Sequence, residues 1–285
     1  MNIAEPRLEV ISAGVNALST RVVLFDFDGT ISLIRSNWMD VMVPMMIEIL
    51  AECKSGETED QLRVVVEDFV WRLTGQETVY QMIRLASEVD QRGGTAKDPL
   101  EYKHMYLDAL WNRIRGRVED LKNGASPDKY MVPGSRWLLE MLRARGMKLY
   151  LASGTDEQYM KEEARMLDVY KYFDGGVYGA LDDYKSFSKG ILIRRILDSA
   201  EFKGSEFLAF GDGFVEIEEV KKVGGVAVGA ATAEPDCLTI DEWKRSRLVG
   251  VGADIIVPNY LARTELMNAL FPGETVPPVE PSQES

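Results

Sequence analysis

The stretch that decides the fold is Val22-Val23-Leu24-Phe25-Asp26-Phe27-Asp28-Gly29-Thr30, an apolar run that ends in two carboxylates and a glycine. Continuous apolar runs of this kind are typical of strands buried on both faces of a parallel sheet. Open α/β folds bind their ligands at the carboxyl ends of such strands. Gly29 lets the chain turn at once, so Asp26 and Asp28 can take separate roles. The plainer interpretation is a strand followed by an Asx turn, which Asp-Gly pairs often form.

Further apolar runs predict the remaining strands of the same sheet. Helical patterns separate these runs, and the alternation predicts an α/β fold: a Rossmann-like parallel sheet with helices on both faces. The predicted strands are Val22–Phe27, Lys148–Ala152, Gly176–Gly179, Phe207–Gly211, Gly225–Gly229 and Asp254–Val257. The predicted helices are Asp156–Tyr172, Lys189–Ser199, Phe214–Lys222 and Tyr260–Phe271.

The interval between the first two predicted strands is far longer than the dozen or so residues that a parallel crossover needs. Helical signals fill it, among them a capping box at Thr58–Gln61 and an N-cap with a first-turn proline at Asp98-Pro99. We therefore expect an all-helical domain inserted into a discontinuous core. The expected division is residues 1–32 and 131–271 for the core, 33–130 for the helical domain, and 272–285 for a flexible tail rich in Pro, Glu and Ser.

Three later segments carry polar residues at corresponding places. Ser153-Gly154 follows the second predicted strand and opens a helix, where a hydroxyl and free backbone N–H groups form a phosphate cradle. Lys189 precedes another helix and can neutralise a phosphate, with Lys185 as a nearby alternative. Asp212 ends a further strand, with Glu216 one turn later, and carboxylates suit Mg²⁺. Taken singly, these segments are better explained as a helix cap, a solvated lysine and an Asp-Gly turn.

In this order, the four segments resemble the four motifs of the haloacid dehalogenase superfamily of phosphotransferases. The resemblance extends from about residue 21 to residue 271 and places the helical insertion where that superfamily has its C1-type cap domain. The first motif and the ordered set are specific, whereas each later motif alone is weak. One departure lies in the last motif, where Glu216 stands at a position more often occupied by Asp.

The resemblance implies a Mg²⁺-dependent phosphatase that reacts through an aspartyl-phosphate. Asp26 would attack phosphorus, and Asp28 would protonate the leaving oxygen and later accept a proton from water. A carboxylate that approaches an anionic phosphate needs cations to offset the repulsion, which agrees with this assignment. The implied phosphate ligands are Ser153, Gly154 and Lys189, and the implied metal ligands are Asp26, Asp28 and Asp212, with Glu216 behind them.

Three activities stay open at this point. The first is hydrolysis of a small phosphate monoester; the second is a sugar phosphomutase that uses the same residues. The third is a non-catalytic module that binds a phosphorylated metabolite. Family members that cleave carbon–halogen or phosphonate bonds typically lack an acid–base aspartate at the position of Asp28, so those activities are disfavoured. The sequence determines neither the substrate nor the oligomeric state.

Residues of the insertion provide candidate substrate contacts. Arg35 and Trp38 follow the first motif, and Gln76 lies between two predicted helices. The plainer interpretations are a solvated arginine, a packed tryptophan and a helix–helix turn. His104 is the only histidine. A single histidine excludes a histidine metal cluster and makes a Ser-His-Asp triad a weak alternative.

The composition limits the class of partner and the cellular compartment. The net charge of −13 over 285 residues argues against a nucleic-acid partner. The two cysteines, Cys53 and Cys237, form neither a disulfide framework nor a zinc-ligand spacing, which favours a reducing compartment. We see no secretion signal and no apolar segment long enough to span a bilayer. We therefore expect a cytoplasmic protein whose partner is a small phosphorylated metabolite.

Overall fold

The computed structural model describes residues 8–181, 188–199 and 201–274, and within them the chain is built on one sheet of seven strands. In chain order the strands are β1 (Glu9–Val10), β2 (Val22–Phe25), β3 (Lys148–Asp156), β4 (Gly176–Ala180), β5 (Phe207–Gly211), β6 (Val226–Ala230) and β7 (Ile255–Val257). Their order across the sheet is β1-β7-β6-β5-β2-β3-β4. Neighbours are parallel except β1 and β7, which are antiparallel. The predicted Rossmann-like α/β fold is confirmed.

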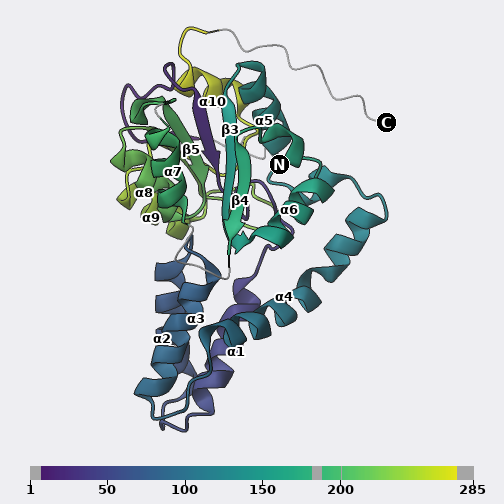
Figure 1. Ribbon diagram of the computed structural model, residues 1–285, viewed down its shortest axis with the longest axis vertical. Coiled ribbons are helices and arrows are strands. Elements are labelled where there is room, and N and C mark those ends of the chain that lie inside the picture. Colours follow the sequence, from purple (N-terminus) through teal and green to yellow (C-terminus); the bar gives the residue numbers. More distant parts are fainter. Residues whose placement is uncertain (1–7, 182–187, 200, 275–285) are drawn as a thin grey trace, which may run out of the picture.

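The helices form two groups, and Figure 1 shows one group around the sheet and the other below it. The helices around the sheet are α5 (Ser135–Ala144), α6 (Glu157–Met166), α7 (Lys189–Asp198), α8 (Phe214–Lys222), α9 (Glu242–Gly250) and α10 (Arg263–Leu270). The second group, called here the helical insertion, consists of α1 (Met39–Ala51), α2 (Glu59–Leu73), α3 (Thr78–Gln91) and α4 (Pro99–Lys122). It faces the carboxyl ends of the parallel strands. Short 3₁₀ turns occur at Pro127–Tyr130, Tyr170–Tyr172 and Gly204–Glu206.

Local signals set the starts of the insertion helices. The Thr58 hydroxyl accepts a hydrogen bond from the Gln61 N–H, and the Gln61 side chain accepts one from the Thr58 N–H, which completes the predicted capping box. At α4 the Asp98 carboxylate accepts a hydrogen bond from the Leu100 N–H over 2.8 Å, and Pro99 occupies the first turn. These caps satisfy backbone groups that would otherwise lack partners at each helix start.

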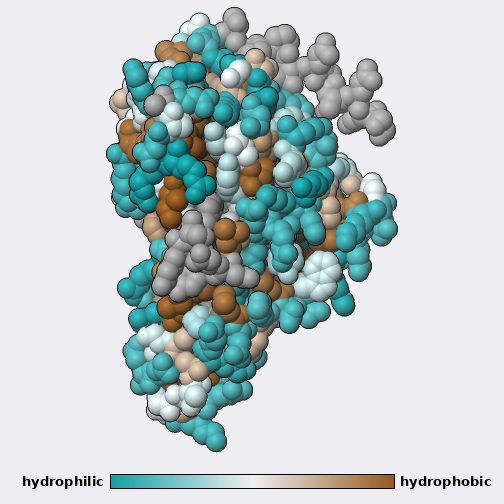
Figure 2. Space-filling view, viewed as in Figure 1, coloured by the Kyte–Doolittle hydropathy of each residue, from teal (hydrophilic) through white to brown (hydrophobic). Residues whose placement is uncertain are grey.

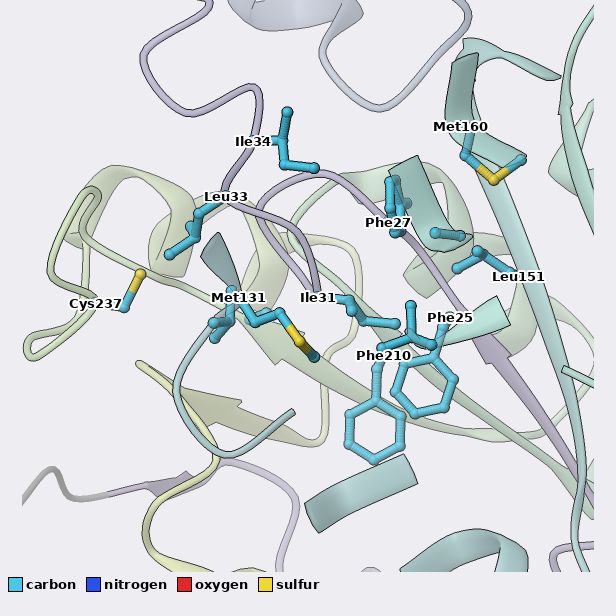
Figure 3. Close-up of a cluster of buried hydrophobic side chains, with 14 of the residues drawn as sticks. Phe25, Phe27, Ile31, Leu33, Ile34, Met131, Leu151, Met160, Phe210 and Cys237 are labelled. Carbon is cyan, nitrogen blue, oxygen red and sulfur yellow. The ribbon is translucent and has the colours of Figure 1, made fainter. Parts of the chain in front are cut away.

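Buried side chains fix the loop that follows β2. The rings of Phe25 on β2 and Phe210 on β5 stack with centroids 4.8 Å apart, and Tyr260 meets Phe210 edge to face. Figure 3 shows Phe27 and Ile31, from the loop itself, within the same cluster of buried side chains. The loop therefore cannot shift without disturbing the core, so the polar side chains between these anchors are held in place.

Some element ends differ from those predicted. β2 stops at Phe25 rather than Phe27, because the carbonyl of Phe27 accepts three turn hydrogen bonds from the following residues. Helix α6 ends at Met166 rather than Tyr172, since Asp168 adopts a left-handed conformation with a φ of 53°. Helix α10 begins later than predicted.

Two elements were not predicted, namely β1 and α9. β1 is a two-residue strand at the sheet edge. Of the α9 residues, Leu248 alone is buried, so this helix lacks the apolar periodicity that reveals a helix in sequence. Lys185 and residues 275–285 of the expected tail lie outside the described residues.

The visible face of the described residues is mainly hydrophilic, with hydrophobic side chains at scattered positions (Figure 2). Among these residues, no helix combines the length and apolar composition that crossing a bilayer requires. Cys53 and Cys237 are both free thiols.

Phe210→Ala is expected to lower the free energy of unfolding by about 3–5 kcal/mol, because it removes a fully buried ring and leaves a cavity. Urea denaturation followed by circular dichroism measures this change. The control is Val64→Ala on α2, where the side chain is 69% exposed and the change should stay within about 0.5 kcal/mol. A loss for Phe210→Ala no larger than that of the control would contradict the role given to this ring.

Candidate active site

The loop after β2 is tied directly to the end of β5. The Asp26 N–H donates to the Phe210 carbonyl over 2.9 Å, and the Asp212 N–H donates to the Thr30 hydroxyl over 3.0 Å. Gly29 has a φ of +71°, and a Cβ there would clash with the Asp212 carboxylate. Glycine is therefore required at this position, both for its conformation and for the close approach of Asp212.

Lys189 links the first and last predicted motifs. Its Nζ lies 2.7 Å from Asp26 Oδ1 and 2.6 Å from Glu216 Oε2, and all three side chains are buried. The second Glu216 oxygen accepts the Gly213 N–H over 3.0 Å. Burial raises the pKa of Asp26 well above its usual range, although Lys189 opposes the rise. For Lys189, burial acts to lower the pKa, whereas Asp26 and Glu216 act to raise it. The two carboxylates have the larger effect, so the pKa of Lys189 is raised and the ammonium stays charged.

Asp28 occupies a different environment from Asp26. Its Oδ2 accepts hydrogen bonds from the Thr155 hydroxyl over 2.8 Å and from the Ser153 hydroxyl over 3.3 Å. Its Oδ1 is buried and has no hydrogen-bond partner among the described residues. Burial raises the pKa of Asp28 to about 6, against the opposing effect of Arg35. The group is therefore suited to exchange a proton near neutral pH.

The acidic side chains fit a divalent cation. Asp26, Asp212 and Glu216 each offer a carboxylate oxygen within 4.8 Å of the others. Both Glu216 oxygens already accept hydrogen bonds. Within the described part of the chain, no side-chain hydrogen bond or ion pair engages Asp26 Oδ2 or Asp212 Oδ1. Carboxylate oxygens are the ligands that Mg²⁺ prefers, so Asp26 and Asp212 are the candidate ligands and Glu216 lies behind them.

Arg35 is buried rather than solvated, so the plainer interpretation of this residue is wrong. Its Nη2 lies 2.7 Å from Glu163 Oε1 and its Nε lies 3.0 Å from the same atom. The two side chains are 8% and 5% exposed. Arg35 thus joins the start of the insertion to α6 and places a guanidinium beside Asp28.

These side chains surround a cavity of about 90 Å³ between the sheet and the helical insertion. The turn between α2 and α3 closes over it: a Cβ on Gly154 would lie 2.6 Å from the Gln76 carbonyl oxygen. Every residue predicted for the site lines this cavity except Glu216, namely Asp26, Asp28, Arg35, Trp38, Gln76, Ser153, Gly154, Lys189 and Asp212.

Sequence reasoning missed several residues of the site. Gln81, Tyr106 and Thr155 also line the cavity. Lys244 on α9 donates to Asp212 Oδ2 over 3.0 Å and to Glu234 Oε1 over 3.0 Å. Thr155 follows Ser153 closely and is the one that a search around the second motif would have found. The others carry no local signal, because their role depends on which elements pack together.

Comparisons with known proteins agree with this geometry. The model of the haloacid dehalogenase-like hydrolase family matches residues 20–224. No curated protein matches the sequence.

Three solved structures have similar folds at low identity. A phosphonoacetaldehyde hydrolase-like protein from Oleispira antarctica has a TM-score of 0.56 at 14% identity, over 92% of this chain and 96% of that one. A predicted phosphoglycolate phosphatase from Haemophilus somnus has a TM-score of 0.55 at 14% identity, over 87% and 98%. A candidate β-phosphoglucomutase from Thermotoga maritima has a TM-score of 0.50 at 18% identity, over 87% and 99%.

Asp28→Asn is expected to stabilise the metal-free protein increasingly as pH rises. The folded-state pKa of about 6 exceeds the usual value of 3.8, so the folded wild type binds this proton more tightly than the unfolded chain does. Its contribution to stability is complete below pH 3.8 and is lost as pH rises through 6, whereas asparagine never ionises. The gain of the variant over wild type should grow by about 2 kcal/mol between pH 4 and pH 7.5.

Urea denaturation at both pH values, in the presence of a chelator, measures this difference. Glu48→Gln, on an exposed position of α1, is the control and should show no comparable growth. A pH-independent difference between Asp28→Asn and wild type would rule out a raised pKa at this position.

Proposed function

This chain belongs to the haloacid dehalogenase-like hydrolase family, and on that premise we propose that it is a Mg²⁺-dependent phosphatase that hydrolyses a small phosphate monoester through an aspartyl-phosphate. One observation carries the proposal: two carboxylates with different surroundings share one small cavity with a buried lysine. Asp26 is held by Lys189 over 2.7 Å, whereas Asp28 is held by hydroxyl groups and keeps one oxygen without a partner. Two carboxyl groups in unlike environments are suited to nucleophilic and acid–base roles.

The reaction takes place in two displacements. In the first, a carboxylate oxygen of Asp26 forms a bond to phosphorus while the bond from phosphorus to the ester oxygen breaks. Asp28 donates its proton to that departing oxygen. In the second, a water oxygen attacks phosphorus, its proton passes to Asp28, and the Asp26 carboxylate leaves as inorganic phosphate forms. Division into two steps is the general advantage of a covalent intermediate.

Cations and N–H groups offset the negative charge of the phosphoryl group. Lys189 and the Ser153-Gly154 segment line the cavity at the ends of β3 and α7 and bind the phosphoryl oxygens. Asp26 and Asp212, together with Asp28, would hold Mg²⁺, which would supply positive charge that reduces the repulsion between carboxylate and phosphate. Glu216 keeps Lys189 in place through its 2.6 Å ion pair.

The helical insertion, taken as residues 33–130, acts as a cap on a core of residues 1–32 and 131–271. Its α2–α3 turn lies close to Gly154 of β3 and to Gly213 at the start of α8, so a closed cap excludes water from the reaction. Arg35, Trp38 and Gln76 face the leaving group from the cap side of the cavity. A cavity of about 90 Å³ is small for a ligand pocket, which favours a short leaving group.

Asp26→Asn is expected to abolish Mg²⁺-dependent release of inorganic phosphate from an aryl phosphate and from a panel of phosphorylated metabolites. Asp28→Ala should lower the rate by roughly 10²–10⁴-fold, because it removes the acid–base group. Asp128→Asn, on the exposed 3₁₀ turn, is the control and should retain wild-type activity. Residual turnover in Asp26→Asn equal to wild type would refute the mechanism.

Product analysis separates the alternatives. Formation of an isomerised sugar phosphate in place of inorganic phosphate would favour the phosphomutase. Tight binding of phosphorylated metabolites without turnover in Mg²⁺ would favour the non-catalytic module.

Trp38→Ala is expected to shift specificity toward larger esters. Trp38 lines both the catalytic cavity and a neighbouring cavity of about 580 Å³, so its removal joins the two. Wild type should have a higher kcat/KM for phosphate esters of two- or three-carbon alcohols than for hexose phosphates, and the variant should reduce this ratio at least about tenfold. Trp111→Ala, a half-exposed residue of α4 outside the catalytic cavity, is the control. An unchanged ratio in Trp38→Ala would show that Trp38 does not limit substrate size.

A further inference from the structure

A second lysine, Lys244, contacts the acidic cluster at Asp212, a carboxylate other than the two that Lys189 contacts. The Nζ of Lys244 lies 3.0 Å from Asp212 Oδ2, 3.0 Å from Glu234 Oε1 and 3.3 Å from Thr232 Oγ1. The Lys244, Asp212 and Glu234 side chains are 13%, 14% and 16% exposed. Three oxygens from two segments, the turn after β5 and the loop after β6, therefore surround one largely buried ammonium.

Other contacts orient two of these oxygens, those of Thr232 and Glu234, toward the ammonium. The Thr232 hydroxyl donates its proton to the Gly29 carbonyl over 3.0 Å, so its lone pairs are left for Lys244. The second oxygen of Glu234 accepts the Asn37 N–H over 3.4 Å, so the first faces the ammonium. The ammonium thus lies 3.0 Å from each of two carboxylates and is fully paired.

Such a set of oxygens also suits a metal ion. Two carboxylates and a hydroxyl around one point are hard ligands of the kind that divalent cations take. In two-metal phosphatases the ions lie about 3.5–4 Å apart, close enough for one carboxylate to contact both. Asp212 can do this, because its Oδ2 contacts Lys244, its Oδ1 takes part in no side-chain hydrogen bond among the described residues, and its carboxylate lies within 4.8 Å of those of Asp26 and Glu216. A lysine ammonium is a compact point charge that can replace such an ion.

We propose that Lys244 is a built-in cation that occupies a second cation position beside the catalytic metal, so that Asp212 has a single oxygen left for a divalent ion and the centre is mononuclear. The inference rests on the proposed function, which supplies the first ion. Lys244 is thus a positioning residue for Asp212, and it prevents Asp212 and Glu234 from recruiting a further metal.

The position is open to an incoming ion once the lysine is removed. Asp212, Thr232, Glu234 and Lys244 all line the neighbouring cavity of about 580 Å³. That volume has room for a hydrated cation and its remaining water ligands. Loss of the ammonium would leave the Asp212 and Glu234 carboxylates close together without a counter-charge, which favours the binding of a cation in its place.

The test counts Mn²⁺ ions bound per chain by isothermal titration calorimetry, with metal-free protein and Mn²⁺ as the probe. We expect one ion in wild type and two in Lys244→Ala, the second with a dissociation constant on the order of 10⁻⁴–10⁻³ M, as in weak oxygen-ligand sites. Lys244→Arg keeps the charge and should bind one ion. The double variant Lys244→Ala/Glu234→Ala loses a ligand and should also return to one.

A matched lysine provides the control for nonspecific effects. Lys221 lies 2.8 Å and 3.0 Å from the two oxygens of Asp254, but only one carboxylate is involved there, so Lys221→Ala should not gain an ion. If Lys244→Ala fails to fold, Lys244→Gln keeps most of the side-chain volume without the charge and replaces it. Thermal unfolding with and without Mn²⁺ is a second measure, since an added site increases the shift in Tm above that of wild type.

The number of Mn²⁺ ions bound by wild type tests the proposed function, and the difference between wild type and the Lys244 variants tests the role of Lys244. A wild type that binds no Mn²⁺ would contradict the proposed catalytic metal. An equal count in wild type and the folded neutral Lys244 variants would overturn the role of Lys244. A gain of one ion that is lost again in the double variant supports it, whatever the wild-type count is.

Discussion

One buried ammonium, that of Lys189, neutralises part of a dense group of carboxylates at the carboxyl ends of β2 and β5. Asp26 and Glu216 contact it at 2.7 Å and 2.6 Å. Buried carboxylates without such partners would cost several kcal/mol each. The protein therefore gathers several carboxylates at this edge of the sheet, and the ion pairs of Lys189 and Lys244 make that arrangement compatible with a stable fold.

Asp26 and Asp28 have different charged and hydrogen-bonding partners, although only one residue separates them in sequence. Burial raises the pKa of both. Asp26 has a full positive charge at ion-pair distance, whereas Asp28 has hydroxyl partners and a guanidinium already paired with Glu163. Lys189 opposes the rise in the pKa of Asp26, and Arg35 opposes the rise in the pKa of Asp28, so a different cation acts on each carboxyl group. The difference comes from the neighbouring elements rather than from the residues themselves.

The fold was predictable wherever the local sequence pattern reflects how the element is buried in the folded protein. Apolar runs predicted the strands of the parallel part of the sheet because both faces of those strands are buried: Val23 and Phe25 of β2 enter one hydrophobic cluster, and Val22 and Leu24 enter another. The α9 helix escaped prediction because its stability comes from contacts with other elements. Its Trp243 ring packs against Trp71 of α2, and Arg247 donates hydrogen bonds to the carbonyls of Trp71 and Arg72.

The sequence by itself determined the α/β fold and placed Asp26 and Asp212 directly after two strands and Ser153 near the end of a third, although β3 continues to Asp156 rather than stopping at Ala152. These residues come together because the carboxyl ends of neighbouring parallel strands meet at one edge. Tertiary structure alone decided which further groups surround them. Arg35 forms an ion pair with Glu163 on α6, and Lys244 forms one with Asp212. The partners in each pair are far apart in the chain. Periodicity and spacing predict which face of a helix or strand a residue lies on. They carry no information about which charged residue, distant in sequence, will pair with it. That choice is made when the helical insertion and α9 pack against the ends of the sheet.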